Sequence, residues 1–113
     1  MTSPSPFQGH YGATVSPHLV ELTSSVLFGD VWERPQLSKR DRSIATVALL
    51  ISKFRTEELK GHVARALANG VTRDEIGELV LHIAFYAGWP TAASAVRVIQ
   101  EAYDELDAAR LVE

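Results

Sequence analysis

The chain has 113 residues, of which 46% are hydrophobic and 22% are charged, and its formal net charge at pH 7 is −3. These values are typical of one globular domain, and without a surplus of Lys and Arg no nucleic-acid partner is expected. The sequence holds no cysteine, which excludes disulfides, thiol catalysis and iron–sulfur ligation. Neither a membrane span, which needs ~20 apolar residues, nor a signal peptide is predicted, so we expect a cytoplasmic protein without membrane contact.

Two regions are expected from the distribution of turn-forming residues. Residues 1–16 contain Gly, Pro, Ser and Thr in close succession and are predicted to be an irregular arm. This arm is either disordered or docked on a neighbouring subunit. Residues 17–113 show helical periodicity without strand patterns or repeats, and they are predicted to form one all-α domain of five to six helices with short connections.

The first predicted helix begins at Ser16-Pro17, with Ser as the N-cap and Pro in the first helical position, and it ends at Gly29. The second predicted helix occupies residues 38–53. Its segment 44–51 is apolar nearly all round, which is typical of a helix that is buried on most sides.

The segment between these helices, residues 30–37, is predicted to be a loop, because Pro35 disfavours helix in the residue before it. Trp32 and Arg34 in this loop either cover a pocket or serve packing and solvation alone. Arg42 lies in the first turn of the second helix, where the helix dipole gives a cation no stabilisation. This position suggests that Arg42 binds a carboxylate, in the protein or in a ligand.

A helical hairpin is predicted from residue 56 to residue 90. Thr56 is expected to cap its first helix, and Asn69-Gly70 is expected to end that helix with a left-handed C-cap. Thr72 and Glu75 form a complete T-x-x-E capping box for the second helix.

The last predicted helix follows Gly88-Trp89-Pro90, which breaks the hairpin's second helix and places Pro near the first position of the next. The apolar stripe of this last helix is rich in alanine. Alanines allow another helix to approach closely, either within the chain or across a subunit boundary.

Two pairs of polar residues, each one helical turn apart, lie in the hairpin. Glu58 precedes His62 on the first helix, and His82 precedes Tyr86 on the second. Because residues four positions apart share a helix face, each pair can direct two functional groups into one pocket. A carboxylate beside an imidazole raises the pKa of the ring, so Glu58 and His62 are candidates for acid–base catalysis near neutral pH.

Each pair also has a purely structural interpretation. Glu58 and His62 can form an exposed pair that stabilises the helix by roughly a few tenths of a kcal/mol. His82 can be a hydrogen-bonded core histidine and Tyr86 an amphipathic core residue. A pocket shared by both pairs is predicted because they lie on adjacent helices. No metal site is predicted, since the two histidines lie on different helices without an H-E-x-x-H pattern.

Several short patterns occur in order along the chain: W-x-R-P from Trp32, R-S from Arg42, E-L-x-x-H from Glu58, N-G-V-T-R-D-E-I from Asn69 and Y-x-G-x-P from Tyr86. In these patterns the stretch from Gly29 to about Leu106 resembles the carboxymuconolactone decarboxylase family, within the alkylhydroperoxidase D-like superfamily. The resemblance implies a compact helical domain that assembles into a ring-like homo-oligomer, a homotrimer or a homohexamer.

The resemblance also implies an activity. This is the decarboxylation of a small carboxylated lactone, 4-carboxymuconolactone, to 3-oxoadipate enol-lactone and CO2 in aromatic-compound catabolism, without a cofactor. The peroxidase branch of the superfamily uses a C-x-x-C pair where this chain has residues 55–58, which contain no sulfur. Cysteine-based peroxidase activity is therefore excluded.

Such a decarboxylation needs a proton donor for the carbon that loses CO2 or for a carbon conjugated to it. His62, with Glu58 behind it, is the first candidate and Tyr86 is the second. His82 is expected to orient the substrate or to share in the proton transfer.

Four further residues are predicted to bind the substrate. Arg34 and Arg42 are candidates for the cation that stabilises negative charge at the lactone carbonyl, with protonated His62 as a third candidate. Trp32 and Trp89 are expected to wall the pocket. Other interpretations stay open: a related lyase or isomerase acting on a different small acid, or a non-catalytic oligomeric binding protein of the same fold. A redox enzyme would need a bound flavin, haem or metal.

Overall fold

The structure is a computed structural model that describes residues 15–112, so almost all of the predicted arm lies outside the described residues. Every regular element in this range is helical, as predicted. The elements are α2 (Pro17–Leu22), a π-helix (Thr23–Phe28), a 3-10 helix (Val31–Glu33), α3 (Lys39–Ser52), α4 (Thr56–Ala68), α5 (Arg73–Ala87) and α6 (Trp89–Val112). The chain divides into two compact units between Lys39 and Arg40, and each unit is described by itself.

In the first unit, α2 begins as the sequence predicts. The Ser16 hydroxyl accepts a hydrogen bond from the Leu19 backbone N–H at 3.4 Å, and a proline holds the first helical position. The π-helix that continues α2 ends at Gly29, where a Cβ atom would lie only 2.6 Å from the Ser25 carbonyl oxygen. Only glycine therefore tolerates this close approach. The predicted loop contains the 3-10 helix, which buries Trp32.

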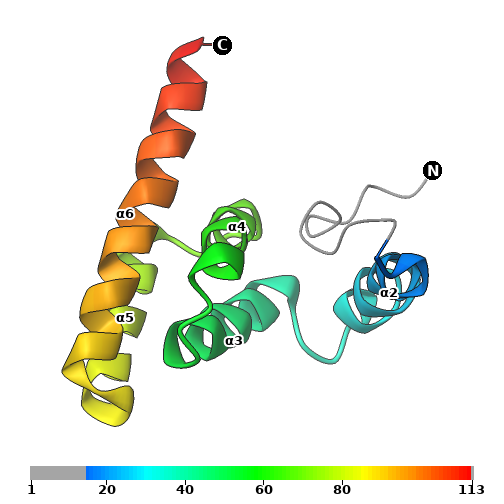
Figure 1. Cartoon of the computed structure of the whole chain (residues 1–113), viewed down its shortest axis with the longest axis horizontal. Coiled ribbons are helices and arrows are strands. Elements are labelled where there is room, and N and C mark those ends of the chain that lie inside the picture. Colours follow the sequence, from blue (N-terminus) through cyan, green and yellow to red (C-terminus); the bar gives the residue numbers. More distant parts are fainter. Residues whose placement is uncertain (1–14, 113) are drawn as a thin grey trace. The chain divides into compact units, whose positions relative to one another are not determined.

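In the second unit, α4 and α5 both pack on α6. Helices α5 and α6 run side by side in opposite directions, and α4 lies on another side of α6 (Figure 1). The small side chains of Ala92, Ala95 and Ala102 are buried on α6, which lets its neighbours approach closely. Leu59, Val63 and Ala66 of α4 and Ile76, Val80 and Ile83 of α5 complete most of this core.

Polar contacts tie the helices of this unit together. Arg73 donates to Asp107 at 2.7 Å and lies over the Tyr103 ring at 4.3 Å, which joins α5 to α6. Lys60 of α4 donates to Glu105 of α6 at 3.1 Å. Asn69 at the end of α4 donates to the Ser43 hydroxyl on α3 at 3.0 Å, and Arg40 at the start of α3 pairs with Glu75 at the start of α5.

The expectation that α3 is buried on most sides is wrong for the single chain. Its buried residues are Ser43, Val47 and Ile51, which form one stripe, whereas Leu49 is 58% exposed. An apolar pattern reports which side chains avoid water, and it does not specify whether the same chain or another one covers them.

The boundaries of the hairpin follow from local chemistry, with one correction. Gly70 has a φ of 99° after α4, and the capping box of Thr72 and Glu75 is present with both of its hydrogen bonds. Thr56, however, is the first helical residue of α4 and not its cap. The N-cap is Arg55, which makes no side-chain capping bond.

These two threonines provide a matched pair for measuring the capping energy. Replacing Thr72 by Ala is expected to lower the free energy of unfolding by about 1 kcal/mol, because the backbone N–H of Glu75 loses its acceptor. Replacing Thr56 by Ala removes no capping bond and is expected to cost less than about half of that. Urea unfolding of both variants followed by circular dichroism checks the difference, and equal losses would contradict it.

Candidate functional site

The exposed face of α5 carries a carboxylate, an imidazole and a phenol in one row. The His82 and Tyr86 rings, one turn apart, lie with their centroids 4.7 Å from each other and their planes inclined by 32°. They line an open hollow together with Glu78, Leu81 and Phe85. His82 and Tyr86 thus line one hollow, as expected for residues one helical turn apart.

Both rings of this pair are accessible to a ligand. His82 is exposed and Tyr86 is 82% exposed, so the alternative interpretation of a core histidine beside a core tyrosine is wrong for the single chain. All residues that line the hollow belong to α5. One helix can supply the floor of a binding site but not its opposite wall.

His62 lies in a different environment on α4. Its side chain is 5% exposed, on the same face as the core residues Leu59, Val63 and Ala66. Burial lowers the pKa of the His62 imidazole to about 4, and the nearby positive charge of Arg65 acts in the same direction.

The Glu58 carboxylate raises the pKa of His62, as predicted, but its effect is smaller than the two opposing ones. A pKa of about 4 does not favour proton exchange by this ring near neutral pH, where the imidazole is neutral. A neutral buried imidazole can orient neighbours through a hydrogen bond, but it is a poor source of protons.

The hollow on α5 includes His82 and Tyr86 but neither Glu58 nor His62. The structure of one chain thus does not bring the two predicted pairs together at this place. Packing explains the separation, because α4 directs His62 into the core around α6, whereas the His82 face of α5 points away from α6.

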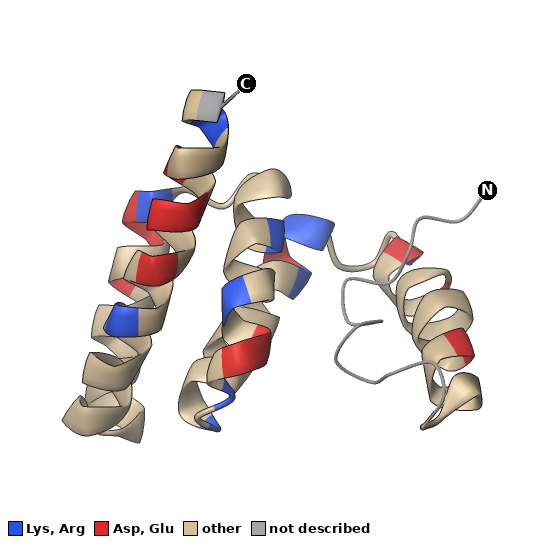
Figure 2. Cartoon of the chain, turned by 45° about the horizontal axis from the view of Figure 1, so that its top comes forward, with Lys and Arg blue, Asp and Glu red and all other residues tan. Residues whose placement is uncertain are grey.

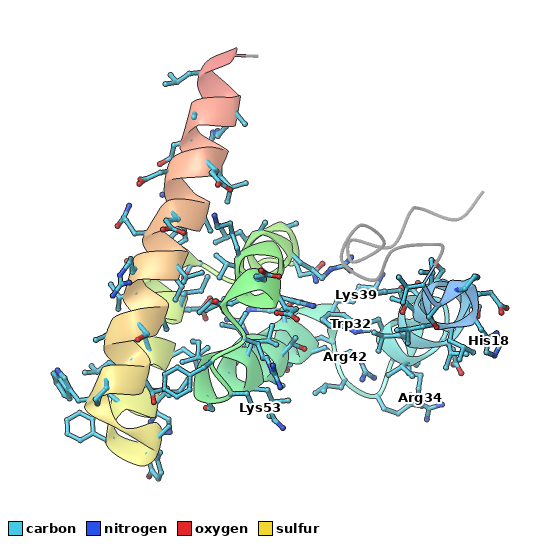
Figure 3. The ribbon with its side chains drawn as sticks, in the orientation of Figure 1. His18, Trp32, Arg34, Lys39, Arg42 and Lys53 are labelled. Carbon is cyan, nitrogen blue, oxygen red and sulfur yellow. The ribbon has the colours of Figure 1, made fainter. Side chains whose placement is uncertain are left out.

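The four predicted substrate-binding residues are divided between the two units. Trp32, whose ring centroid lies 5.7 Å from that of Phe28, is buried, and Arg34 is exposed; both belong to the first unit (Figure 3). Arg42 is half-buried on α3 in the second unit.

Trp89 is 64% exposed at the start of α6, where its ring meets that of Phe85 edge-on at 6.0 Å. Through Phe85, which lines the hollow, Trp89 lies beside the site of His82 and Tyr86.

Glu78 is a candidate that sequence reasoning missed. It lines the hollow one helical turn before His82, so the spacing that singled out the other pairs also applies to it. Arg65 was missed as well, and it lies one turn after His62, whose pKa it lowers.

Two classes of site find no support in the part of the chain that the structure covers. Within residues 15–112, no three His, Asp or Glu side chains gather closely enough to hold a metal ion. None of the helices described here combines the length and the apolar character that crossing a membrane requires.

These observations define the class of protein: it is all-helical, and its candidate acid–base groups lie on a helical hairpin. The model of the carboxymuconolactone decarboxylase family matches residues 17–101, and the chain belongs to this family. It is 40% identical over 83 residues to a 4-carboxymuconolactone decarboxylase of Acinetobacter baylyi, an alignment that covers 74% of this chain and 62% of that relative.

Two further relatives match over a similar length. A nitrosuccinic acid decarboxylase of Metarhizium robertsii is 40% identical over 86 residues, covering 76% of this chain and 60% of the relative. An uncharacterised 15.0 kDa protein of Paracoccus denitrificans is 29% identical over 82 residues, covering 71% and 61%. The chain thus matches about three-fifths of the length of these curated relatives.

Proposed function

We propose that this chain is the subunit of a decarboxylase that acts on a small carboxylated substrate, with 4-carboxymuconolactone as the first candidate. The observation that carries the proposal is 40% identity to two proteins named as decarboxylases, over about three-quarters of the chain. Their names specify different acids, so the removal of CO2 is better supported than any one substrate. A cytoplasmic location stays a prediction.

The reaction on the lactone balances without an external oxidant or reductant. The bond between the ring carbon and the carboxylate breaks, CO2 leaves, and the electron pair is delocalised through the ring double bond onto the lactone carbonyl oxygen. A proton then adds to a ring carbon and gives the enol-lactone. The protein must bind the carboxylate form, stabilise the developing oxyanion and deliver one proton.

We assign the proton delivery to His82 and Tyr86. Both side chains are exposed, they touch each other, and they line one hollow with the Glu78 carboxylate. With a pKa of about 4, His62 carries its proton in only about one molecule in a thousand at pH 7. We therefore assign His62 and Glu58 to orienting roles instead of proton donation.

Positive charge for the substrate carboxylate and the oxyanion is assigned to Arg34 and Arg42, as the resemblance implies. Guanidinium groups bind carboxylates through two parallel hydrogen bonds, which fixes the orientation of the acid. Trp89 supplies apolar surface beside the hollow and excludes water there, and Trp32 is the second wall residue of the proposal.

We also propose that the chain assembles with copies of itself, as a homotrimer or a homohexamer. Large apolar side chains of α5 and α6 support this part of the proposal, because Phe85 is 74% exposed and Val96 is 53% exposed. Exposed apolar surface of this kind is typical of subunit interfaces.

The test is direct. The purified chain is incubated with 4-carboxymuconolactone and, separately, with nitrosuccinic acid, while CO2 release and ultraviolet absorbance are followed. Release of CO2 from either acid is expected, together with the loss of the corresponding absorbance. A folded, self-associated protein that binds these acids but releases no CO2 would contradict the enzyme assignment and favour a binding protein.

A further inference from the structure

An apolar groove runs along the seam between α5 and α6. Two adjoining hollows form it, and they share Gly77, Val80 and Val96 in their lining. One hollow extends to Trp89 near the turn between the helices, and the other extends to Tyr103. Gly77 and Ala84 of α5 and Ala92 and Ala93 of α6 have small side chains at the bottom of the groove. The groove can therefore accept protruding side chains from another helix.

The end of this groove near the turn between the helices carries no charge, whereas Arg73 lines its other end. From Leu79 to Val96 the sequence contains no Asp, Glu, Lys or Arg, and Figure 2 shows the corresponding end of the hairpin without a charged residue. Leu81 and Trp89 on this surface are 50% and 64% exposed. A continuous apolar surface of this kind indicates a contact that the single chain does not make.

A second apolar surface lies on the N-terminal helix, which we define as α2 with its π-helical continuation (residues 17–28). Helix α2 has no buried residue. Leu19, Leu22 and Val26, spaced at three and four positions, are 45%, 39% and 47% exposed. Such a stripe is amphipathic and needs a partner surface to cover it.

We propose that the N-terminal helix of a second copy of this chain lies in the groove between α5 and α6. The inference rests on the proposed self-association and names the two surfaces that meet. Their lengths agree, because residues 17–28 span about 18 Å and the groove-lining part of α5, from Arg73 to Ala84, spans about the same length at ~1.5 Å per residue.

The charges beside the two surfaces are also complementary. The described chain has no Lys or Arg from Val15 to Glu33, and the exposed Glu21 lies next to Leu22 of the apolar stripe. The exposed Arg97 lies next to Val96 of the groove and makes no ion pair with the described residues. The N-terminal helix offers Arg97 an acidic partner in Glu21.

This arrangement would also border the hollow that holds His82 and Tyr86. Leu81 lines both the groove and that hollow, so a helix in the groove comes to lie beside it. The second copy then supplies a wall that α5 alone lacks. The site would be complete only in the assembly.

Because the sequence has no cysteine, engineered cysteines report this contact without interference. Chains with Val26→Cys are mixed with differently tagged chains with Val96→Cys and are oxidised mildly. We expect a disulfide between the two kinds of chain. A mixture of Val26→Cys with Ala108→Cys is the matched control and is expected to give none, because Ala108 is exposed on the same helix α6 but outside the groove.

Sedimentation equilibrium provides an independent measurement. Val96→Glu is expected to weaken self-association by about tenfold or more, because it places a charge in the apolar contact. Ala108→Glu adds the same charge to α6 outside the groove and is expected to change association by less than about twofold. Circular dichroism verifies that both variants retain their helices.

Three results would overturn the inference. Self-association of the unmodified chain without the Val26–Val96 disulfide would reject this contact and leave the assembly itself standing. A disulfide formed within one chain that carries both cysteines would show that the helix covers its own groove. A chain that stays monomeric at all concentrations would reject the contact and the proposed self-association together, without bearing on decarboxylation.

Discussion

Replacing His82 by Ala is expected to lower the kcat for decarboxylation by about 100-fold or more, which is the usual contribution of a positioned general acid. The physical reason is the loss of the exposed imidazole that touches the Tyr86 ring in the hollow on α5. The substitution removes an exposed side chain and not a core residue, so the helices should remain folded. Initial rates of CO2 release at saturating substrate provide the measurement.

Two further variants test whether the loss of activity is specific to the His82–Tyr86 pair. Tyr86→Phe keeps the ring and removes only the hydroxyl, so its rate tells whether the phenol takes part in the proton transfer. Lys53→Ala, at an exposed position just after α3 and outside the hollow, is the control and is expected to keep its rate within about twofold. Near-normal rates for both His82→Ala and Tyr86→Phe would reject the assignment of proton delivery to this pair.

The stability of the fold is expected to fall by about 3 kcal/mol between pH 7 and pH 4 because of His62 alone. In the folded chain its pKa is lowered from 6.5 to about 4, since the charged ring would be buried. Below pH 6.5 the His62 imidazole is protonated in the unfolded chain but stays neutral in the folded chain until the pH approaches 4. The free energy of unfolding therefore decreases as the pH falls. The loss approaches about 1.4 kcal/mol for each pH unit in this window.

Comparison with His62→Gln isolates this contribution. Carboxylates such as Glu75 and Asp107, whose pKa values are lowered by their hydrogen-bonded partners, also lose stabilisation in acid. Their contribution is present in both proteins and cancels in the difference. Urea unfolding at one fixed protein concentration should give the variant a shallower dependence on pH than the wild type. Identical slopes, or an NMR titration that gives His62 a pKa near its ordinary value, would contradict the expectation.

The sequence predicted well those features that depend on neighbouring residues. Thr72 with Glu75 specified the start of α5, and Gly70 specified the end of α4, because capping bonds join groups within a few positions of each other. Thr56 shows the limit of this reasoning, since a threonine near a helix start is not always its cap. The family resemblance was confirmed by the match over residues 17–101.

The environment of each candidate residue was harder to predict. His82 lies in an apolar stretch and is nevertheless exposed, whereas His62 beside two charged residues is buried. The signal for His62 was present, because it shares a helix face with Leu59 and Ala66. For His82 and Leu49 no such signal exists, since hydrophobicity indicates burial without telling which chain provides it.

Glu75 links two helices through a single carboxylate. It accepts from the Thr72 backbone N–H at 3.0 Å, closing the cap of α5, and it pairs with Arg40 at the first turn of α3. The cap and the tie between helices therefore depend on one carboxylate, the cap on its Oε1 atom and the tie on its Oε2 atom. Substitutions of Thr72 and Arg40, although they lie on different elements, should be energetically coupled: the cost of the double variant would differ from the sum of the single costs.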